Sequence, residues 1–386
     1  MKIAVLRESS PGEIRVALTP GSAQTLIKKG VGVRVQKGCG AAAGFPDALY
    51  EAASAELAES PADTLAGADI ALAVRVNEHS PEFAPGQIVI AHADPYTSRS
   101  TIDKLCASNS SLLALELVPR ITRAQSMDAL SSQAMVGGYQ AVLLGAMKLP
   151  RMLPMMMTAA GTVHPAKVFV IGAGVAGLQA LSTAKRLGAV ASGYDVRPAV
   201  REQVESLGAK FVQFDVGGGE GAGGYAKELT PEQQAMQRQL MSDTIAGSDI
   251  VITTALVPGR PAPKLIPADA VKRMAPGSVI VDLAAERGGN CELTRPGETF
   301  TCPECGVTIV GLTNYAALAP GTASQLLSGN FVNLLKHLLD KQGNLRFDLA
   351  APSDEIVTGM LVCHGGQVVH AGLRKAFGLE TPAAVA

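Results

Sequence analysis

A glycine-rich turn between two apolar segments constrains the fold of this chain more than any other feature of its sequence. The apolar run Val168–Ile171 predicts a buried parallel strand, and a helical pattern of leucine and alanine follows it. Gly172, Gly174 and Gly177 stand between the two in the spacing G-x-G-x-x-G, and a second predicted strand ends at Asp195. Together these features predict the βαβ unit that binds a dinucleotide.

Each of these residues has a separate task in such a unit. Gly172 permits a tight turn, Gly174 lets the backbone approach a pyrophosphate, and Gly177 lets the helix pack closely on the sheet. The free N–H groups and the dipole at the start of the helix attract the phosphates. Asp195 can accept hydrogen bonds from a ribose diol and repels a 2′-phosphate, so we expect NAD(H) to bind and NADP(H) to be rejected. The alternative is a glycine-rich turn in an α/β domain that binds no nucleotide.

The chain is long for a single hydrophobic core. Its 386 residues predict two domains, and 47% hydrophobic with 17% charged residues is typical of a compact soluble protein. A net charge of −1 without a basic stripe argues against nucleic acid as a partner. Six cysteines and no secretory leader favour a reducing compartment. The most apolar long stretch, residues 141–161, is interrupted by Lys148, Arg151 and two prolines, so we do not expect it to span a bilayer.

Alternating strand and helix patterns predict the fold class. It is α/β, with two Rossmann-like, doubly wound parallel-sheet domains joined by crossing helices and a cleft between them. We expect an N-terminal domain over residues 1–130, completed by 325–386, and a Rossmann NAD(H)-binding domain over residues 131–324. The two crossing helices are predicted at Ser131–Met147 and Ala323–Leu339. The other predicted elements are a helix at Ser22–Lys29 and strands at Lys2–Leu6, Gly32–Gln36, Asp69–Val76, Gln87–His92, Leu112–Leu117, Lys210–Phe214, Asp249–Thr253, Ser278–Leu283 and Thr308–Leu312.

Two segments between these elements are candidates for ligand contacts. The polar stretch Pro119–Tyr139 lies between the two predicted domains, where open α/β proteins place a ligand crevice. The alternative is that Ser126 or Asp128 caps the following helix and that the arginines are only solvated. The glycine-rich segment 217–224 leads into Tyr225 and predicts a mobile flap, the alternative being a surface loop without a role.

Residues for acid–base or metal chemistry are sparse. Cys302 and Cys305 resemble half of a zinc knuckle, but only Cys291, Cys363 and His364 remain as further ligands, so we expect a hairpin with incidental thiols and no metal site. A lone histidine at a strand end, His92, is more often structural than catalytic. The sequence has no nucleophile elbow, paired-carboxylate motif or P-loop lysine, and this favours direct hydride transfer between two nicotinamides.

Taken together, the motifs resemble those of a known family. Over nearly its whole length the chain is similar to the soluble NAD(H)-binding component, the alpha-1 subunit, of proton-translocating nicotinamide nucleotide transhydrogenase. The resemblance rests on the glycine fingerprint and on RVALTP (15–20), PRITRAQSMDALSSQ (119–133), PMMMTAAGTV (154–163), REQVESLG (201–208), GGYAKE (223–228), ITTALVPGRPAP (252–263) and PGSVIVDLAAERGGNC (276–291).

The resemblance implies a role for individual residues. Four polar residues match those that orient the nicotinamide, and one of them, Gln125, also matches a residue facing the NADP(H)-bearing partner. Three residues match contacts to the adenosine ribose, two more match further nucleotide contacts, and Tyr225 matches the tip of the mobile loop. In that order these are Arg120, Gln125, Asp128 and Ser131; Asp195, Val196 and Arg197; and Leu256 and Gly224. With Ser126, Met127, Val175 and the three glycines they form the expected cofactor-binding set, and no catalytic acid or base is expected.

The resemblance also implies partners. Such a component is a homodimer that docks on a separate NADP(H)-binding beta subunit and a membrane-embedded subunit, so the expected location is cytoplasmic, on the inner face of the cell membrane. The expected activity is direct hydride transfer from NADH to NADP⁺ on the partner, coupled to proton translocation.

Alanine dehydrogenases share this fold and are the main alternative. They place an arginine, a lysine and a histidine around an amino or keto acid, and Arg15 and His92 match the first and last. The lysine position falls in the predicted strand Asp69–Val76, which contains no lysine and has Ala73 in its place. The missing charge argues against a keto-acid substrate. A third possibility is an NAD-binding module without catalytic activity.

Overall fold

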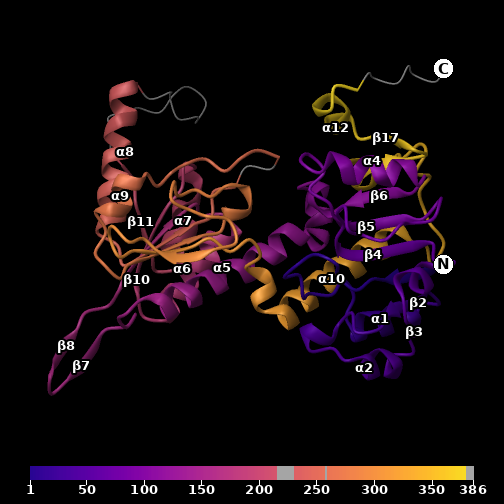
Figure 1. The fold of residues 1–386 in the computed structure, drawn as a ribbon, viewed down its shortest axis with the longest axis horizontal. Coiled ribbons are helices and arrows are strands. Elements are labelled where there is room, and N and C mark those ends of the chain that lie inside the picture. Colours follow the sequence, from indigo (N-terminus) through magenta and orange to yellow (C-terminus); the bar gives the residue numbers. More distant parts are fainter. Residues whose placement is uncertain (215–229, 257–258, 380–386) are drawn as a thin grey trace. The chain divides into compact units, whose positions relative to one another are not determined.

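The chain divides into two compact units, as the computed structural model shows (Figure 1). The structure describes residues 1–214, 230–256 and 259–379. The first unit comprises Met1–Gln133 and the segment that begins at Ala316, and the second comprises Ala134–Tyr315. The first boundary falls inside helix α5 (Ala129–Lys148). Helix α10 (Pro320–Leu338) lies wholly in the first unit, so the chain returns to that unit before α10 begins.

The first unit is built on an eight-stranded sheet with the order β17-β16-β6-β5-β4-β1-β2-β3. Strands β1 to β6 are parallel, and β16 and β17 add an antiparallel edge. The strands are β1 (Lys2–Val5), β2 (Gly32–Gln36), β3 (Glu56–Ala58), β4 (Ile70–Arg75), β5 (Ile88–His92), β6 (Ser111–Ala114), β16 (Leu361–His364) and β17 (Gln367–Val368). The remaining α-helices are α1 (Pro20–Ile27), α2 (Asp47–Ala52), α3 (Pro61–Leu65), α4 (Arg99–Ala107), α11 (Glu355–Met360) and α12 (Ala371–Ala376).

The hydrophobic core of the first unit lies on both faces of this sheet. On one face, Leu72 and Ile90 belong to a buried cluster that includes Phe331 of α10. On the other face, Val89 belongs to a cluster that includes Ile102 of α4. Because neighbouring residues of a strand point to opposite faces, the near-continuous apolar strands are buried on both sides.

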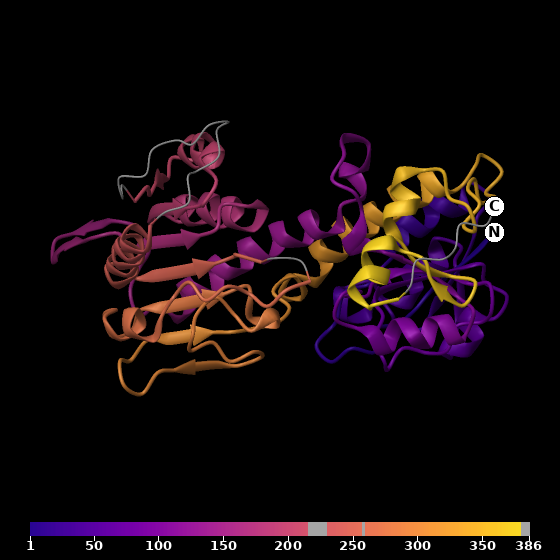
Figure 2. The same ribbon diagram turned by 90° about the horizontal axis from the view of Figure 1, so that it is seen from above.

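The second unit is built on a seven-stranded sheet with the order β11-β10-β9-β12-β13-β15-β14, whose strands lie alongside one another in Figure 2. All of its strand pairs are parallel except β14 with β15. The strands are β9 (Lys167–Ile171), β10 (Val190–Tyr194), β11 (Lys210–Phe211), β12 (Ile250–Thr253), β13 (Val279–Asp282), β14 (Thr299–Thr301) and β15 (Thr308–Val310). The helices besides α5 are α6 (Val175–Arg186), α7 (Arg201–Ser206), α8 (Pro231–Ala246) and α9 (Ala268–Lys272).

Alternation along β9 shows that this sheet is also covered on both faces. Val168 and Val170 belong to a buried cluster that contains α6 residues such as Leu181. Phe169 and Ile171 belong to a different cluster, which contains residues of α8 and α9. The fold class of two Rossmann-like, doubly wound α/β domains is thereby confirmed.

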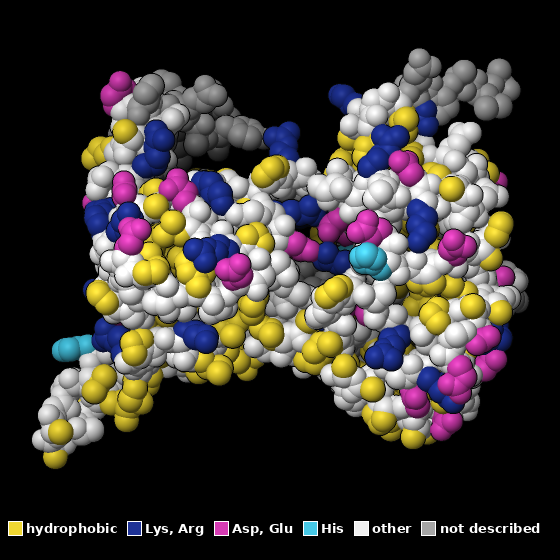
Figure 3. All heavy atoms as spheres, viewed as in Figure 1, with side chains coloured by type: hydrophobic (Ala, Val, Ile, Leu, Met, Phe, Trp, Pro, Cys, Tyr) yellow, Lys and Arg dark blue, Asp and Glu magenta, His cyan; other side chains and the backbone are white. Residues whose placement is uncertain are grey.

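A separate two-stranded hairpin of the second unit was not predicted. It consists of β7 (Met156–Thr158) and β8 (Gly161–Val163), and all six residues are exposed. Hydrophobic side chains are visible on this hairpin in Figure 3. Its sequence contains no buried alternation, so the pattern that identifies half-buried strands is absent here.

Two predicted strands are shorter than expected, and one membrane-related expectation can be examined. Strand β6 stops at Ala114 because the chain turns into a 3₁₀ helix (Leu115–Leu117), which brings Glu116 Oε1 to 2.8 Å from the N–H of Ala93. Strand β11 has only the residues Lys210–Phe211 of the predicted Lys210–Phe214. In the described part of the chain, no helix has the length and hydropathy needed to cross a membrane.

Candidate nucleotide-binding site

The glycine-rich turn joins β9 to α6 in a conformation that requires glycine at two positions. Gly172 has φ +98°, and a Cβ atom there would lie 2.6 Å from Thr254 Oγ1. A Cβ atom at Gly177 would lie 1.8 Å from the carbonyl oxygen of Gly172, so the helix can approach the strand only without a side chain. At Gly174, by contrast, a Cβ atom would meet nothing within 4 Å. The turn is therefore packed on its protein side and open at Gly174.

The open position coincides with the amino terminus of α6. Gly174 is the N-cap residue of this twelve-residue helix, and no side chain caps it. The first N–H groups of the helix therefore lack an intrahelical partner and are free to bind an anion. Val175, the first residue of the helix, is 45% exposed. These features fit the pyrophosphate of a dinucleotide.

The acid expected to bind the ribose, Asp195, follows β10 directly and is tied to the glycine-rich turn. Its Oδ2 accepts a hydrogen bond of 2.8 Å from the N–H of Ala173. Its two oxygens also accept from the Arg197 side chain, at 2.9 Å from Nε and 3.0 Å from Nη2, and Oδ1 accepts from the Arg197 N–H at 2.9 Å. Burial raises the pKa of Asp195, but the Arg197 side chain and the two peptide N–H groups outweigh it and lower the pKa overall.

The Asp195–Arg197 pair changes the expectation for cofactor choice. A carboxylate has about four acceptor positions, and in this structure four hydrogen bonds occupy them. A ribose diol can bind Asp195 only if the Arg197 side chain, which is 60% exposed, moves away. The guanidinium is also a group that can pair with a 2′-phosphate. Neighbouring Val196 is 76% exposed.

The loop after β12 lies beside this turn and is held by residues that the sequence did not single out. Thr254 Oγ1 donates to the carbonyl oxygen of Gly172 at 2.9 Å. Asn290, fully buried, bonds both the N–H and the carbonyl of Ala255, at 3.1 and 2.9 Å. These contacts fix the backbone next to Leu256, which is 51% exposed. Residues 257–258 lie outside the described chain, as do Gly224 and Tyr225 of the expected flap.

A buried carboxylate organises the neighbouring strand end. Both oxygens of Asp282 are fully used: Oδ1 accepts from Thr253 Oγ1 at 2.9 Å, and Oδ2 accepts from Thr294 Oγ1 at 2.6 Å and from the Cys291 N–H at 3.0 Å. Asp282 itself is 0% exposed. Burial and tertiary contacts of this kind cannot be read from spacing, which is why neither Asn290 nor Asp282 was predicted.

The remaining expected site residues belong to the first unit. Asp128 caps α5, because its Oδ1 accepts from the N–H of Ser131 at 2.9 Å and its Oδ2 from Ser131 Oγ at 2.6 Å. Of the two capping candidates, Asp128 is therefore the one that caps the helix. The carbonyl of Ser126 accepts from Asn330 Nδ2 at 2.9 Å, which anchors the 3₁₀ segment Thr122–Met127 on α10.

Two polar side chains of this segment are available to a ligand. Arg120 and Gln125 are exposed, and neither side chain bonds any residue that the structure describes. Arg123, in contrast, pairs with Asp354 at 2.8 Å, and Met127 is 6% exposed and packs in the core. The structure thus separates the expected residues into free polar groups, a capping pair and a core residue.

The residues that would serve an alanine dehydrogenase are engaged with other protein groups. Arg15, 5% exposed, donates from Nε and Nη2 to Glu13 at 2.7 and 2.5 Å and from Nη1 to Gln133 at 2.8 Å. His92 Nδ1 lies 3.4 Å from Glu116 Oε1. With its guanidinium neutralised by Glu13, Arg15 is poorly suited to pair with a substrate carboxylate.

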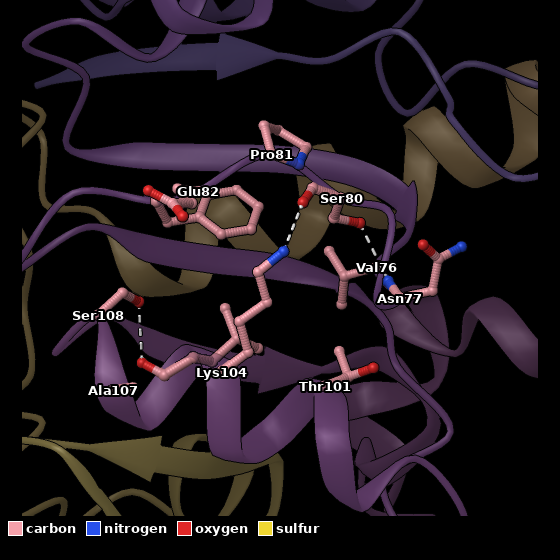
Figure 4. Close-up of a pocket in the computed structure, with 11 residues that line it drawn as sticks. Val76, Asn77, Ser80, Pro81, Glu82, Thr101, Lys104, Ala107 and Ser108 are labelled. Atoms are coloured by element: carbon pink, nitrogen blue, oxygen red, sulfur yellow. Dashed lines mark hydrogen bonds between the residues drawn. The ribbon is translucent and has the colours of Figure 1, made fainter.

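A small pocket of about 260 Å³ in the first unit lies apart from these residues, between α4 and the segment after β4 (Figure 4). Lys104 Nζ is directed into it but already donates to the carbonyl oxygens of Glu78 and Ser80, at 3.2 and 3.1 Å. Nothing in the pocket supplies acid–base chemistry. Across the described ranges, no three metal-ligating side chains gather in one place.

The turn, the helix terminus and the acid after β10 define a Rossmann-like α/β protein of the dinucleotide-binding class. Two family models match the chain, "Alanine dehydrogenase/PNT, N-terminal domain" over residues 4–137 and "Alanine dehydrogenase/PNT, C-terminal domain" over residues 141–371. The chain therefore belongs to the alanine dehydrogenase/PNT family.

Individual relatives from both branches of the family match nearly the whole chain. The chain is 44% identical to an NAD(P) transhydrogenase subunit alpha of Rhodospirillum rubrum, over 97% of this chain and 99% of that protein. The crystal structure of transhydrogenase from Sinorhizobium meliloti matches with a TM-score of 0.83 and 43% identity, over 96% of this chain and 100% of that one. The alanine dehydrogenase of Halomonas elongata is 31% identical over 98% of each chain. The predicted resemblance to transhydrogenase is confirmed.

Proposed function

We propose that this chain is the NAD(H)-binding component of a proton-translocating transhydrogenase. The observation that carries the proposal is the turn at Gly172–Gly177, which is packed on one side, open at Gly174 and tied to Asp195, in a chain 44% identical to a transhydrogenase alpha subunit. Bound NAD(H) supplies the hydride that passes directly to or from NADP(H) on a partner subunit.

The chain's own residues bind and orient the cofactor. The first N–H groups of α6 hold the pyrophosphate, and Asp195 holds the adenosine ribose after Arg197 has moved. Val175, Val196 and Leu256 offer exposed apolar surface to the nucleotide. Gly224 and Tyr225 belong to the proposed set by resemblance.

In the first unit, Arg120 and Gln125 supply the hydrogen-bonding groups for the nicotinamide end. The Asp128–Ser131 cap, with Ser126 and Met127, fixes the segment that carries them. Orientation, and not acid–base catalysis, is the contribution of these residues, because hydride transfer depends steeply on the geometry of the reacting rings.

The same proposal covers assembly and location. We infer a homodimer that works with an NADP(H)-binding beta subunit and a membrane-embedded subunit, at the cytoplasmic face of the cell membrane. The support is the name of the relatives, which are subunits of NAD(P) transhydrogenase. Proton translocation then belongs to the partners.

The experiment that tests the proposal mixes this protein with an NADP(H)-binding transhydrogenase component. NADPH is added with an NAD analogue whose reduced form absorbs at a separate wavelength, and reduction of the analogue is followed. We expect reduction only when both proteins are present. Calorimetry with NADH alone tests the binding step separately, since binding without transfer would favour a module that binds NAD without catalytic activity.

Alanine dehydrogenase is the second candidate, because a relative with that name is 31% identical. The pairing of Arg15 with Glu13 and the absence of a lysine from β4 speak against it. We expect no reduction of NAD⁺ by L-alanine and no oxidation of NADH by pyruvate with ammonium. Alanine-dependent NAD⁺ reduction by the isolated protein would overturn the assignment and point to Arg15 and His92 as the reaction centre.

A further inference from the structure

The hairpin β14–β15 carries two cysteines in one tight turn. Thr301 pairs with Thr308 at the end of the ladder, the N–H of Cys302 donates to the carbonyl of Val307 at 2.8 Å, and the N–H of Gly306 donates back to Cys302 at 2.8 Å. Gly306 has φ +70°, which favours glycine. The expected hairpin is confirmed, and its closure brings the Cys302 and Cys305 thiols within hydrogen-bond distance of each other.

The environment of the turn treats the two sulfurs differently. The hydrogen bond from Cys305, assisted by the peptide N–H groups of Glu304 and Cys305, lowers the pKa of Cys302. The Lys272 ammonium, 2.7 Å from Glu304, also lies close enough to interact with a Cys302 thiolate. Burial raises the pKa of Cys305, and the Cys302 thiol raises it further. Cys302 is thus the sulfur that ionises first, with a thiol beside it.

The turn lies at the edge of the sheet opposite the nucleotide site. Gly306 and Gly277 precede the parallel strands β15 and β13, and the N–H of Gly277 donates to the carbonyl of Gly306 at 2.9 Å. Gly172 and Asp195, in contrast, follow the carboxyl ends of β9 and β10. A chemical change at the turn therefore leaves the dinucleotide cradle intact.

We propose that Cys302 and Cys305 form a redox-active dithiol that a small hydroperoxide converts to an intramolecular disulfide. The Cys302 thiolate attacks the peroxide, the O–O bond breaks, and the leaving hydroxide takes up a proton to become water (an alcohol for an organic peroxide). Cys302 is then a sulfenic acid. The Cys305 sulfur attacks the Cys302 sulfur, loses its proton, and the S–O bond breaks with release of a second water. Two thiols are oxidised and one peroxide is reduced.

The alternatives are less well supported by the structure. A closed zinc site needs four ligands, and within the described ranges no third His, Cys, Asp or Glu joins the pair. A second thiol pair, Cys106 with Cys363, is also in contact, but Cys363 is 0% exposed and the Cys106 thiol and burial both raise its pKa. A small oxidant should therefore react at the hairpin first.

The test treats the full chain with hydrogen peroxide, removes the excess, denatures the protein and alkylates the remaining thiols. The chain has six cysteines, and we expect four to remain alkylatable after oxidation and all six after reduction with dithiothreitol. Cleavage after Glu304 separates the two cysteines, so peptides that remain linked identify the Cys302–Cys305 disulfide by mass.

Three variants sharpen the test. In Cys305→Ser the sulfenic acid on Cys302 has no neighbouring thiol and should be trapped by dimedone, whereas Cys302→Ser should give neither label nor disulfide. Cys39→Ser, which removes a buried thiol elsewhere, should behave as the unmodified protein. NADH affinity should not change on oxidation, which keeps this outcome independent of the proposed function.

Several results would overturn the proposal. These are six alkylatable thiols after peroxide, a first disulfide between Cys106 and Cys363, or a persistent sulfenic acid on Cys302 in the unmodified protein. One zinc ion per chain, retained by the unmodified protein and lost in both hairpin variants, would replace the dithiol with a metal site.

Discussion

At the scale of single residues, the charge partner of an acid matters as much as the acid. Sequence spacing placed Asp195 at the end of a strand, and the structure has it there. Spacing alone could not show that all its acceptor positions are occupied by Ala173 and Arg197. The preference for NADH over NADPH therefore stays a prediction that depends on both residues of the pair.

Substitutions at the pair should separate these contributions. Asp195→Ala removes hydrogen bonds to a charged group and should weaken NADH binding about ten- to a hundredfold. Arg197→Ala frees the carboxylate, so NADH should bind as well or better while NADPH binds worse. Isothermal calorimetry with both nucleotides measures the four affinities. Equal affinity of the unmodified protein for NADH and NADPH would contradict the prediction.

A second residue-scale prediction concerns Glu8, which lies near the Glu13–Arg15 pair. Burial raises the pKa of Glu8 to about 8, against which the N–H groups of Val74 and Arg75, donating at 2.6 and 3.1 Å, act only in part. A raised carboxyl pKa means that the folded state holds a proton that the unfolded state has lost. Stability should therefore fall as the pH rises from about 4.5 to 8, by at most about 1.4 kcal/mol per pH unit.

Urea unfolding at several pH values compares the unmodified protein with Glu8→Gln. The amide cannot accept from both N–H groups, so the variant should be less stable near pH 5 by about 1–3 kcal/mol. Its free energy of unfolding should decline less steeply up to pH 8, because the titrating group is gone. Parallel pH profiles would show that Glu8 does not titrate in this range.

At the scale of elements, the sequence predicted most of what hydrophobic pattern controls. The parallel strands β1, β2, β4, β5, β9, β12 and β13 are short apolar runs between turn residues, and all of them form. Elements whose existence depends on distant contacts were less accessible. Strand β16 pairs with β6, about 250 residues away, with a register shift, and the exposed hairpin β7–β8 has no apolar alternation. The same limit hid Asn290, whose role depends on the loop that it holds.

The glycine-rich turn offers a matched pair of substitutions at this scale. Gly177→Ala would place a Cβ atom 1.8 Å from the Gly172 carbonyl, so it should push α6 from the sheet and destabilise the unit by about 2–3 kcal/mol. Gly174→Ala meets no protein atom within 4 Å and has φ −77°, so stability should change by less than about 1 kcal/mol.

Binding should reverse that order of severity. The methyl group of Gly174→Ala stands where we propose that the pyrophosphate approaches, so this well-folded variant should lose most of its NADH affinity. Thermal unfolding and NADH titration of both variants provide the measurements. Unchanged NADH affinity in Gly174→Ala would place the phosphates elsewhere.

At the scale of the whole molecule, the two units carry different parts of the proposed chemistry. The second unit has the dinucleotide turn, and the first has polar side chains that bond no described residue, Arg120 and Gln125. Surface charge is mixed: on the face shown in Figure 3, basic and acidic side chains are interspersed over both units. Specific orientation of a cofactor, and not a strong general field, is the property that this arrangement supports.

Hydride transfer to a partner tests this division of labour. If Gln125 fixes the nicotinamide ring, Gln125→Ala should lower transfer to a docked NADP(H)-binding component up to about a hundredfold, because small displacements of reacting atoms reduce rates steeply. NADH affinity should stay within a few-fold, since the pyrophosphate and ribose contacts lie on the second unit. Arg123→Ala, from the same 3₁₀ segment, removes a side chain already paired with Asp354 and should leave transfer nearly unchanged. Equal loss in both variants would mean that the segment acts only through its fold, and unchanged transfer in Gln125→Ala would remove this residue from the proposed site.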